Sequence, residues 1–432
     1  MKDYFLNILE KLTGIRLSDS PSFPRIWKNS SWLLLDNIVR LGGGFVLTVW
    51  LARYLGPEQF GVFNYAIAFV ALFTYFGTLG LNEIIVRNLI RNPSRRDEVI
   101  ATAFILRMFG GTIAFGLALA LVFFLNPLDK TAHWLVGIIA AGIIFQAFEV
   151  IDSYFQSQVL SKYVVWARII PFVFVSTLKV FFIVTGAALI AFAWVWLIEI
   201  VLVGLGLMFV YRWRGFSLRI NKFKNQTAED LIKDAWPMIL SGIAAMIYMR
   251  IDQIMIRHMI GEKAVGIYAA AMKVSEAWYV LGGIIIFSTF PVIINLKTES
   301  ETLYREKCRQ VYKVLIILGA AAAGGTILMV KPIIYFLYGH AYSQSISVLS
   351  VQVLGVMLVY LISASTYALV AEGLQKYHIY RTVLGCLVNV FFNLILIPRF
   401  GVMGAVFSML CSYCVAVFSL LLFKETKAIF RG

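Results

Sequence analysis

Long apolar runs, separated by short polar turns, follow one another along the chain. A helix needs about 20 apolar residues to cross the hydrocarbon core of a bilayer. The runs therefore predict about twelve membrane-spanning helices, at residues 31–54, 62–85, 98–125, 134–157, 163–186, 188–211, 236–259, 265–294, 311–337, 345–370, 378–397 and 402–423. The fifth and sixth runs are nearly continuous, so the chain must turn at Thr185-Gly186-Ala187 to separate them.

Two stretches of the chain resemble each other. Residues 51–66 read LARYLGPEQFGVFNYA and residues 256–271 read IRHMIGEKAVGIYAAA, with Gly56 in the first matching Gly261 in the second. Each stretch holds an apolar helix, a short turn bounded by glycines and a second apolar helix. Self-similarity at about half the chain length is typical of transporters built from two like bundles.

A second repeated motif lies later in each half. It consists of a Lys-Tyr pair followed by an arginine: Lys162, Tyr163 and Arg168 in the first half, and Lys376, Tyr377 and Arg381 in the second. Two repeated motifs in the same order favour duplication over the chance use of glycine in turns.

The longest polar connection, residues 212–235, lies near the middle of the chain. It predicts a cytoplasmic linker between an N-terminal six-helix bundle, residues 30–211, and a C-terminal six-helix bundle, residues 236–432. Because six is even, both bundles enter the membrane in the same orientation, and a pseudo-two-fold axis along the membrane normal relates them.

The segment before the first apolar run, residues 1–29, has two interpretations. Four apolar residues share one helical face, which suits a short helix in the membrane interface: Phe5, Ile8, Leu9 and Leu12. A flexible cytosolic tail is the alternative.

Composition places the chain among integral membrane proteins. Hydrophobic residues make up 60% of its 432 residues and charged residues 14%, with a mean hydropathy of +0.83. Soluble domains contain about 45–50% apolar and about 25% charged residues. The expected fold class is therefore an all-α integral membrane protein made of two six-helix bundles.

The formal net charge of +15 is explained by topology. Most of the 38 lysines and arginines lie in connections on the side of the two termini, among them Arg87, Lys162, Arg168 and Arg212. Cytoplasmic connections are enriched in Lys and Arg. Both termini are thus expected in the cytoplasm, in a multi-pass protein of the cell membrane, and no nucleic-acid partner is needed.

Motifs of catalysis are sparse. The chain has no G-x-x-x-x-G-K-[ST] loop to bind a nucleotide, and its four histidines show no H-E-x-x-H spacing. Cys411 and Cys414 form a C-x-x-C inside an apolar run without a second pair, which argues against zinc or redox chemistry. We expect no enzyme, no metal site and no cofactor.

The candidate functional residues are ionisable side chains inside the apolar runs. A charge at a helix centre costs about 2.5–3.5 kcal/mol on insertion scales, so each needs a partner or water. Asp36 with Arg40, Glu83 with Arg87, and Lys273 with Glu276 are spaced to pair on one helix. Others have no such partner and predict either inter-helix pairs or a hydrated cavity between the halves: Arg107, Lys179, Arg250, Glu149, Asp152, Glu199 and Asp252.

The sequence also resembles a known family. Residues 51–73, LARYLGPEQFGVFNYAIAFVALF, and residues 80–93, GLNEIIVRNLIRNP, resemble the opening of the Wzx-type polysaccharide exporters. Residues 250–274, RIDQIMIRHMIGEKAVGIYAAAMKV, resemble the start of the second half of these proteins. The family belongs to one superfamily with the MATE drug exporters and the lipid II flippases.

This resemblance implies a MATE-like pair of bundles around a cavity, and a flippase without enzyme activity. Its substrate would be a polyprenyl-pyrophosphate-linked oligosaccharide, such as an O-antigen or exopolysaccharide repeat unit, moved from the cytoplasmic to the outer leaflet. Carried onto this chain, the candidate pyrophosphate and glycan contacts are Arg40, Arg107, Lys179 and Arg250. Asp36 and Asp252 are candidates for coupling to H⁺ or Na⁺, and a monomer is expected to suffice.

Two other functions stay open at the level of sequence. A MATE-like exporter of small cationic compounds would use carboxylates and aromatic residues in the same cavity. A membrane glycosyltransferase or polymerase that acts on lipid-linked sugars would normally need a larger outer loop than the short outer turns of this chain.

Overall fold

The computed structural model describes residues 23–427, apart from the side chains of several residues between 23 and 34 and between 287 and 299. Over this range it contains α-helices and short 3₁₀ turns. The helices are α2 (Phe23–Thr78), α3 (Asn82–Arg91), α4 (Arg96–Leu125), α5 (Lys130–Phe145), α6 (Val150–Ser157), α7 (Ser161–Val184), α8 (Leu189–Trp213), α9 (Asn225–Met259), α10 (Glu262–Glu299), α11 (Glu301–Leu328), α12 (Val330–Leu337), α13 (Ser345–Gln352), α14 (Gly355–Ala371), α15 (Gln375–Phe400) and α16 (Val402–Phe418). The predicted interfacial helix around Phe5–Leu12 lies outside the described residues.

The number of membrane spans agrees with the prediction. The described residues hold 11 helical stretches that are long and apolar enough to cross a bilayer. The first of them, Leu35–Arg91, contains the second predicted span and the first from residue 35 onward. They are separated at Gly56, whose backbone angles (φ 68°, ψ 171°) break α2 just before Pro57. The prediction of an all-α membrane protein with about twelve spans is therefore confirmed.

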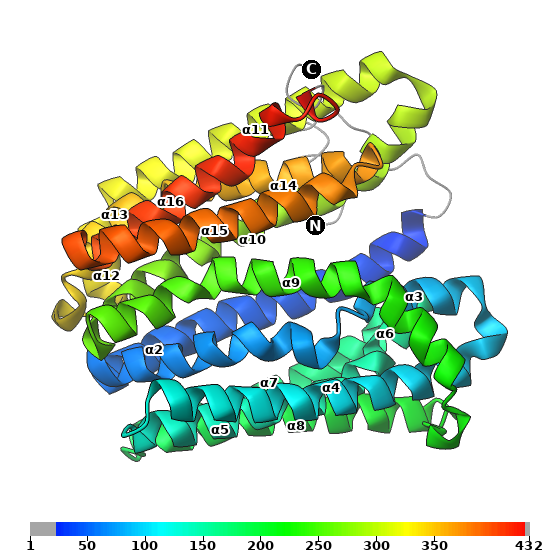
Figure 1. Cartoon of the computed structure of the whole chain (residues 1–432), viewed down its shortest axis with the longest axis horizontal. Helices are drawn as coiled ribbons and strands as arrows, with labels where there is room; N and C mark the ends of the chain where they lie inside the picture. The colour runs from blue at the N-terminus through cyan, green and yellow to red at the C-terminus, as the bar shows by residue number, and fades with distance from the viewer. Residues whose placement is uncertain (1–22, 428–432) are drawn as a thin grey trace. The chain divides into compact units, whose positions relative to one another are not determined.

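The chain divides into two compact units, Pro24–Ile254 and the described residues from Met255 onward. In the first unit, α5 packs against α4 and α8, and α8 packs against α7 (Figure 1). In the second, α14 packs against α10, α11 and α16, and α15 packs along α16 (Figure 1). The division falls inside α9, and a functional boundary at residues 212–235 stays a prediction.

Small residues set the distance between neighbouring helices in the first unit. A Cβ added to Gly111 of α4 would lie 3.0 Å from the Cα of Ile144 in α5. Lipid tails are as apolar as leucine, so helices in a bilayer associate by close packing of this kind. Gly111 therefore allows α4 and α5 to lie in contact along their backbones.

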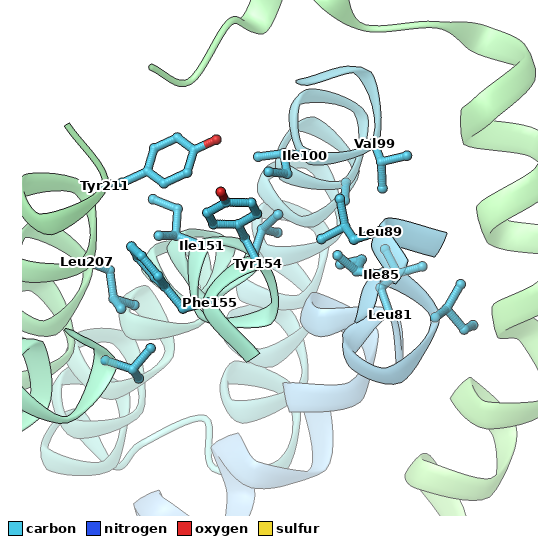
Figure 2. Close-up of a cluster of buried hydrophobic side chains, with 14 of the residues drawn as sticks. Leu81, Ile85, Leu89, Val99, Ile100, Ile151, Tyr154, Phe155, Leu207 and Tyr211 are labelled. Carbon is cyan, nitrogen blue, oxygen red and sulfur yellow. The ribbon is translucent and has the colours of Figure 1, made fainter. Parts of the chain in front are cut away.

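A buried apolar cluster joins α3 and α6 to parts of α4, α7 and α8 (Figure 2). Its labelled members are Leu81, Ile85, Leu89, Val99, Ile100, Ile151, Tyr154, Phe155, Leu207 and Tyr211. Leu231 and Ala235, near the start of α9, are buried in the same cluster. The second part of the predicted linker is thus helical and belongs to the core of the first unit.

Polar contacts hold the rest of the linker to the first unit. Glu98, in the first turn of α4, accepts hydrogen bonds from Arg95 and from Thr227, each at 2.5 Å. Its other carboxylate oxygen lies 2.8 Å from Lys224 Nζ. The Arg96 guanidinium lies 4.6 Å from the ring centre of Phe216, a cation–π contact. Residues 212–235 are therefore packed along the first unit.

The turns that precede the two Lys-Tyr motifs have the same backbone geometry. Val159 and Gly373 both have positive φ, 56° and 72°. The next residue of each turn donates a backbone hydrogen bond to the carbonyl five positions earlier, Leu160 to Phe155 at 2.9 Å and Leu374 to Leu369 at 2.8 Å. Gly56 and Gly261, in the other repeated motif, also share positive φ. The sequence repeats thus correspond to repeated turns.

We expect Gly373→Val to lower the free energy of unfolding by about 1–2 kcal/mol, because the left-handed conformation is unfavourable for a residue with a Cβ. The change isolates backbone strain, since nothing lies within 4 Å of an added Cβ at this position. Thermal unfolding of the detergent-solubilised protein measures it.

Val159→Gly and Gly373→Asn are the matched controls. The first removes the same strain from the equivalent turn, and asparagine tolerates this conformation better than valine. Equal stability of the Gly373→Val and Gly373→Asn proteins would show that the turn carries no such strain.

Candidate functional site

Helices of the first unit line a partly open cavity of about 360 Å³. Its polar lining comes from four elements: Arg40 of α2, Gln146 and Glu149 of a 3₁₀ turn, Arg168 of α7, and Trp196 and Glu199 of α8. Apolar residues complete the wall, namely Phe145, Phe148, Ile200, Val203, Gly204 and Leu207. Charged and amide groups thus meet inside a bundle of membrane-spanning helices.

A break in the fourth span brings two polar residues to the cavity. The α-helical winding of α5 changes at η2 (Gln146–Glu149), a 3₁₀ turn, and resumes in α6. Residues three apart lie on the same side of a 3₁₀ helix. Gln146 and Glu149 have this spacing, which explains why both line the cavity.

Arg168 connects three helices by its charge. Its Nη2 donates to the Asp152 carboxylate of α6 at 2.5 Å, and its Nη1 lies 3.7 Å from the Asp36 carboxylate of α2. Gln156 donates to the other oxygen of Asp152 at 3.1 Å. A guanidinium shared by two carboxylates reduces the cost of burying all three charges.

The predicted pairing of Asp36 with Arg40 on one helix is not what the structure shows. Asp36, 4% exposed, pairs with Arg168 across the helix interface. Within the described part of the chain, Arg40 makes no ion pair or hydrogen bond and acts on Asp36 only through longer-range electrostatics. Arg87 likewise pairs with Asp234 of α9 and not with Glu83. A neighbouring helix can bring a charge closer than the i,i+4 position does.

Lys179 has an inter-helix partner beside the cavity. Its Nζ lies 3.2 Å from the Glu199 carboxylate, so the pair joins α7 to α8. Lys273 and Glu276, by contrast, pair on one helix as their spacing predicts, at 3.3 Å.

Arg107 of α4 is fully buried. Its Nη2 donates to the Asn82 side-chain oxygen at 2.5 Å. Its Nε and Nη1 are buried and have no hydrogen-bond partner in the described structure. Three carboxylates, those of Glu149, Glu83 and Asp152, act on it electrostatically. Arg107 therefore retains donors that a ligand or water could use.

The other two predicted site residues lie on α9. Arg250 is half-buried and Asp252 is 3% exposed. Of the six predicted site residues, only Arg40 lines the cavity directly, while Asp36 and Lys179 pair with residues that line it.

The six predicted site residues do not include Gln146, Trp196 or Arg168, which also line the cavity. Arg168 was grouped with the bases of the connections, but the structure places it inside α7, where it faces two carboxylates. The repeated Lys-Tyr motif is the feature of the sequence that points to Arg168. The arginine of the second motif, Arg381, is buried and donates to Ser365 at 2.6 Å and to the Ile362 carbonyl at 3.0 Å.

A second buried polar group lies in the second unit. Asn389 and Asn393 of α15 are fully buried, and the Asn393 amide donates to the Asn389 side-chain oxygen at 3.1 Å. Ser408 and Ser412 of α16 are also fully buried, and each bonds to a carbonyl of its own helix. These residues carry no formal charge, so no charge-based search of the sequence finds them.

Comparison with known proteins decides the family. The family described as "Polysaccharide biosynthesis protein" matches residues 26–297. The chain belongs to this family. The expected resemblance is thereby confirmed.

Two relatives match most of the chain. The "Probable flippase AglR" of Haloferax volcanii is 25% identical over 393 residues, which cover 87% of this chain and 78% of the relative. The "Uncharacterized membrane protein MJ1375" of Methanocaldococcus jannaschii is 20% identical over 428 residues, 92% of this chain and 98% of the relative.

Solved structures show the same fold. A MATE family multidrug transporter of the MOP superfamily in an inward-facing conformation has a TM-score of 0.76 at 16% identity, covering 93% of this chain and 99% of that one. The lipid II flippase MurJ has a TM-score of 0.72 at 14% identity, covering 93% and 89%. The predicted MATE-like fold is confirmed. The relatives with a named role are flippases or transporters, in agreement with the prediction that the chain is not an enzyme.

We expect Arg168→Ala to destabilise the protein by about 3 kcal/mol, because it leaves the carboxylates of Asp36 and Asp152 buried without their cation. Unfolding of the detergent-solubilised variant, followed by heat or denaturant, measures the loss.

Arg87→Ala is the matched control, since its pair with Asp234 is exposed and such pairs contribute about 0–1 kcal/mol. A loss for Arg168→Ala no larger than for Arg87→Ala would contradict the assignment of Arg168 as the shared cation.

Proposed function

We propose that the protein is a flippase that moves a polyprenyl-pyrophosphate-linked oligosaccharide, such as an O-antigen or exopolysaccharide repeat unit, from the cytoplasmic to the outer leaflet. The observation that carries this proposal is the charged cavity inside membrane-spanning helices of a polysaccharide biosynthesis protein. Two named proteins support it: a relative called a probable flippase and a lipid II flippase with the same fold.

The physical problem fits this function. A headgroup rich in hydroxyls and phosphate cannot cross about 30 Å of hydrocarbon unaided. A polar cavity that opens alternately to each side shelters the headgroup while the lipid tail stays in the bilayer. Solved MATE structures of this fold include inward-facing and outward-facing conformations, which supports alternating access as the mechanism.

The proposed pyrophosphate and glycan contacts are the four cations Arg40, Arg107, Lys179 and Arg250. Arginine binds phosphate oxygens through two parallel N–H donors, and lysine acts as a point charge. Arg107 supports the assignment best, because two of its buried donors have no protein partner in the described structure.

Coupling to an ion gradient, with H⁺ or Na⁺ as the ion, completes the proposal. Asp36 and Asp252 are the proposed coupling residues, since both are buried carboxylates. We further propose that the protein works as a monomer in the cytoplasmic membrane, with both termini in the cytoplasm, as the distribution of Lys and Arg predicts.

A second candidate function is the export of small cationic compounds, which the similarity to multidrug MATE structures favours. The buried donors of Arg107 argue against it, because an organic cation offers them no acceptor. Increased resistance to cationic dyes on overexpression would favour this second function.

Leaflet transfer in proteoliposomes tests the main proposal. A lipid-linked oligosaccharide is supplied from one side, and an impermeant lectin detects its arrival on the other side, with and without a proton or sodium gradient. We expect protein-dependent exposure that responds to one gradient, and loss of that response in Asp36→Asn and Asp252→Asn. No exposure by folded protein would refute the flippase, and an unchanged gradient response in both variants would refute the coupling residues.

In the same assay we expect Arg107→Ala and Arg250→Ala to lower the transfer rate at least about tenfold, since a hydrogen bond to a charged group contributes about 1.5–3 kcal/mol. Expression and unfolding temperature serve as the checks on folding. Arg399→Ala, at an exposed position, is the control for a lost positive charge. Full activity of both the Arg107→Ala and the Arg250→Ala protein would rule out a pyrophosphate contact by either arginine.

A further inference from the structure

The cavity of the first unit is lined by hydrogen-bond donors and acceptors that have no protein partner in the described structure. The Gln146 side-chain oxygen is buried and accepts no hydrogen bond in the described structure. In the same part of the chain, Glu149 and Arg40 line the cavity, and their side chains make neither a hydrogen bond nor an ion pair. Buried polar groups in native proteins are nearly always hydrogen-bonded. The cavity therefore has two acceptor groups and one donor group available to whatever fills it.

The remaining charges of the cavity are already paired. Arg168 donates to Asp152 at 2.5 Å, and Glu199 lies 3.2 Å from Lys179. These pairs fix the positions of α6, α7 and α8 around the cavity. The groups left for recognition are thus Arg40, Gln146 and Glu149, one cation, one amide and one carboxylate.

This combination distinguishes between classes of ligand. A phosphate offers acceptors and would be repelled by Glu149, whereas an organic cation, with or without N–H donors, would be repelled by Arg40. A hydroxyl group donates and accepts. A neutral molecule with several hydroxyls can therefore bond to all three groups at once.

Trp196 adds an apolar surface to the same wall. An indole ring has a large flat face and a single N–H donor. A sugar ring has matching parts, a face of C–H groups and a rim of hydroxyls. The cavity volume of about 360 Å³ also lies in the range of small-molecule sites.

We propose that this cavity is a subsite for one neutral, hydroxyl-bearing sugar residue of the transported glycan. The ring stacks on Trp196, its hydroxyls donate to Gln146 and Glu149, and Arg40 donates to a ring or hydroxyl oxygen. The proposal rests on the proposed function. It makes Arg40 a contact of the glycan, leaves the pyrophosphate to the other proposed cations, and adds specificity for a sugar residue bound within the first unit.

Two probe lipids test the subsite. One is a polyprenyl pyrophosphate that carries a neutral disaccharide, and the other is the same polyprenyl pyrophosphate without sugar. Transfer is followed with an impermeant lectin for the first and an impermeant phosphatase for the second. We expect wild type to prefer the sugar-bearing lipid, and Trp196→Leu and Glu149→Gln to lower this preference at least tenfold. Trp196→Phe, which keeps a ring, should restore part of it.

Trp194→Leu is the matched control, because Trp194 is on the same helix but is 48% exposed and does not line the cavity. We expect it to keep the wild-type preference. An equal preference in Trp194→Leu and Trp196→Leu would overturn the subsite and leave the flippase function intact.

Tryptophan emission of the purified protein, titrated with the free disaccharide, is the second measurement. A response that Trp196→Leu loses and Trp194→Leu keeps supports the subsite, even if wild type moves neither lipid and the proposed function fails. No response in wild type, as for a cavity that holds only water, overturns the subsite. A response to tetraphenylphosphonium that needs Glu149, without one to the disaccharide, also overturns it and favours cation export.

Discussion

The fold of the first unit depends on the pairing of charged side chains inside its membrane-spanning helices. An ion that leaves water loses hydration energy, which only close partners replace. Arg168 of α7 is such a partner for α6 and α2, because its guanidinium faces Asp152 and Asp36. The Lys179–Glu199 pair does the same between α7 and α8. The cavity lies where these pairs hold the helices, so the residues that stabilise the bundle also determine its polar interior.

The second unit also buries an arginine, and hydroxyl and carbonyl groups accept hydrogen bonds from it. Arg381 follows an equivalent turn and donates to Ser365, Thr366 and the Ile362 carbonyl. In the first unit Arg168 faces carboxylates, whereas hydroxyl and carbonyl groups are among the partners of Arg381. Each motif thus places an arginine inside the helix that follows a turn of the same backbone geometry.

Much of the fold follows from the sequence, because hydropathy and glycine placement act locally. Apolar runs predict the spans, and Gly56 predicts the break in α2. The partners of buried charges are harder to predict. Asp36 is four residues from Arg40 but pairs with Arg168, since the nearest charge depends on which helices pack together. Gln146 is neutral, and the 3₁₀ turn that directs it to the cavity has no proline to mark it.

The linker has a consequence for how the protein is made. Leu231 and Ala235 belong to the apolar cluster formed with α3, α4, α6, α7 and α8. Domains fold in order as the chain leaves the ribosome. The core of the first unit is complete only when residue 235 has been synthesised, beyond the last span of the predicted N-terminal bundle. Translation must therefore pass the middle of the chain before its first half can become resistant to the proteases that monitor nascent membrane proteins.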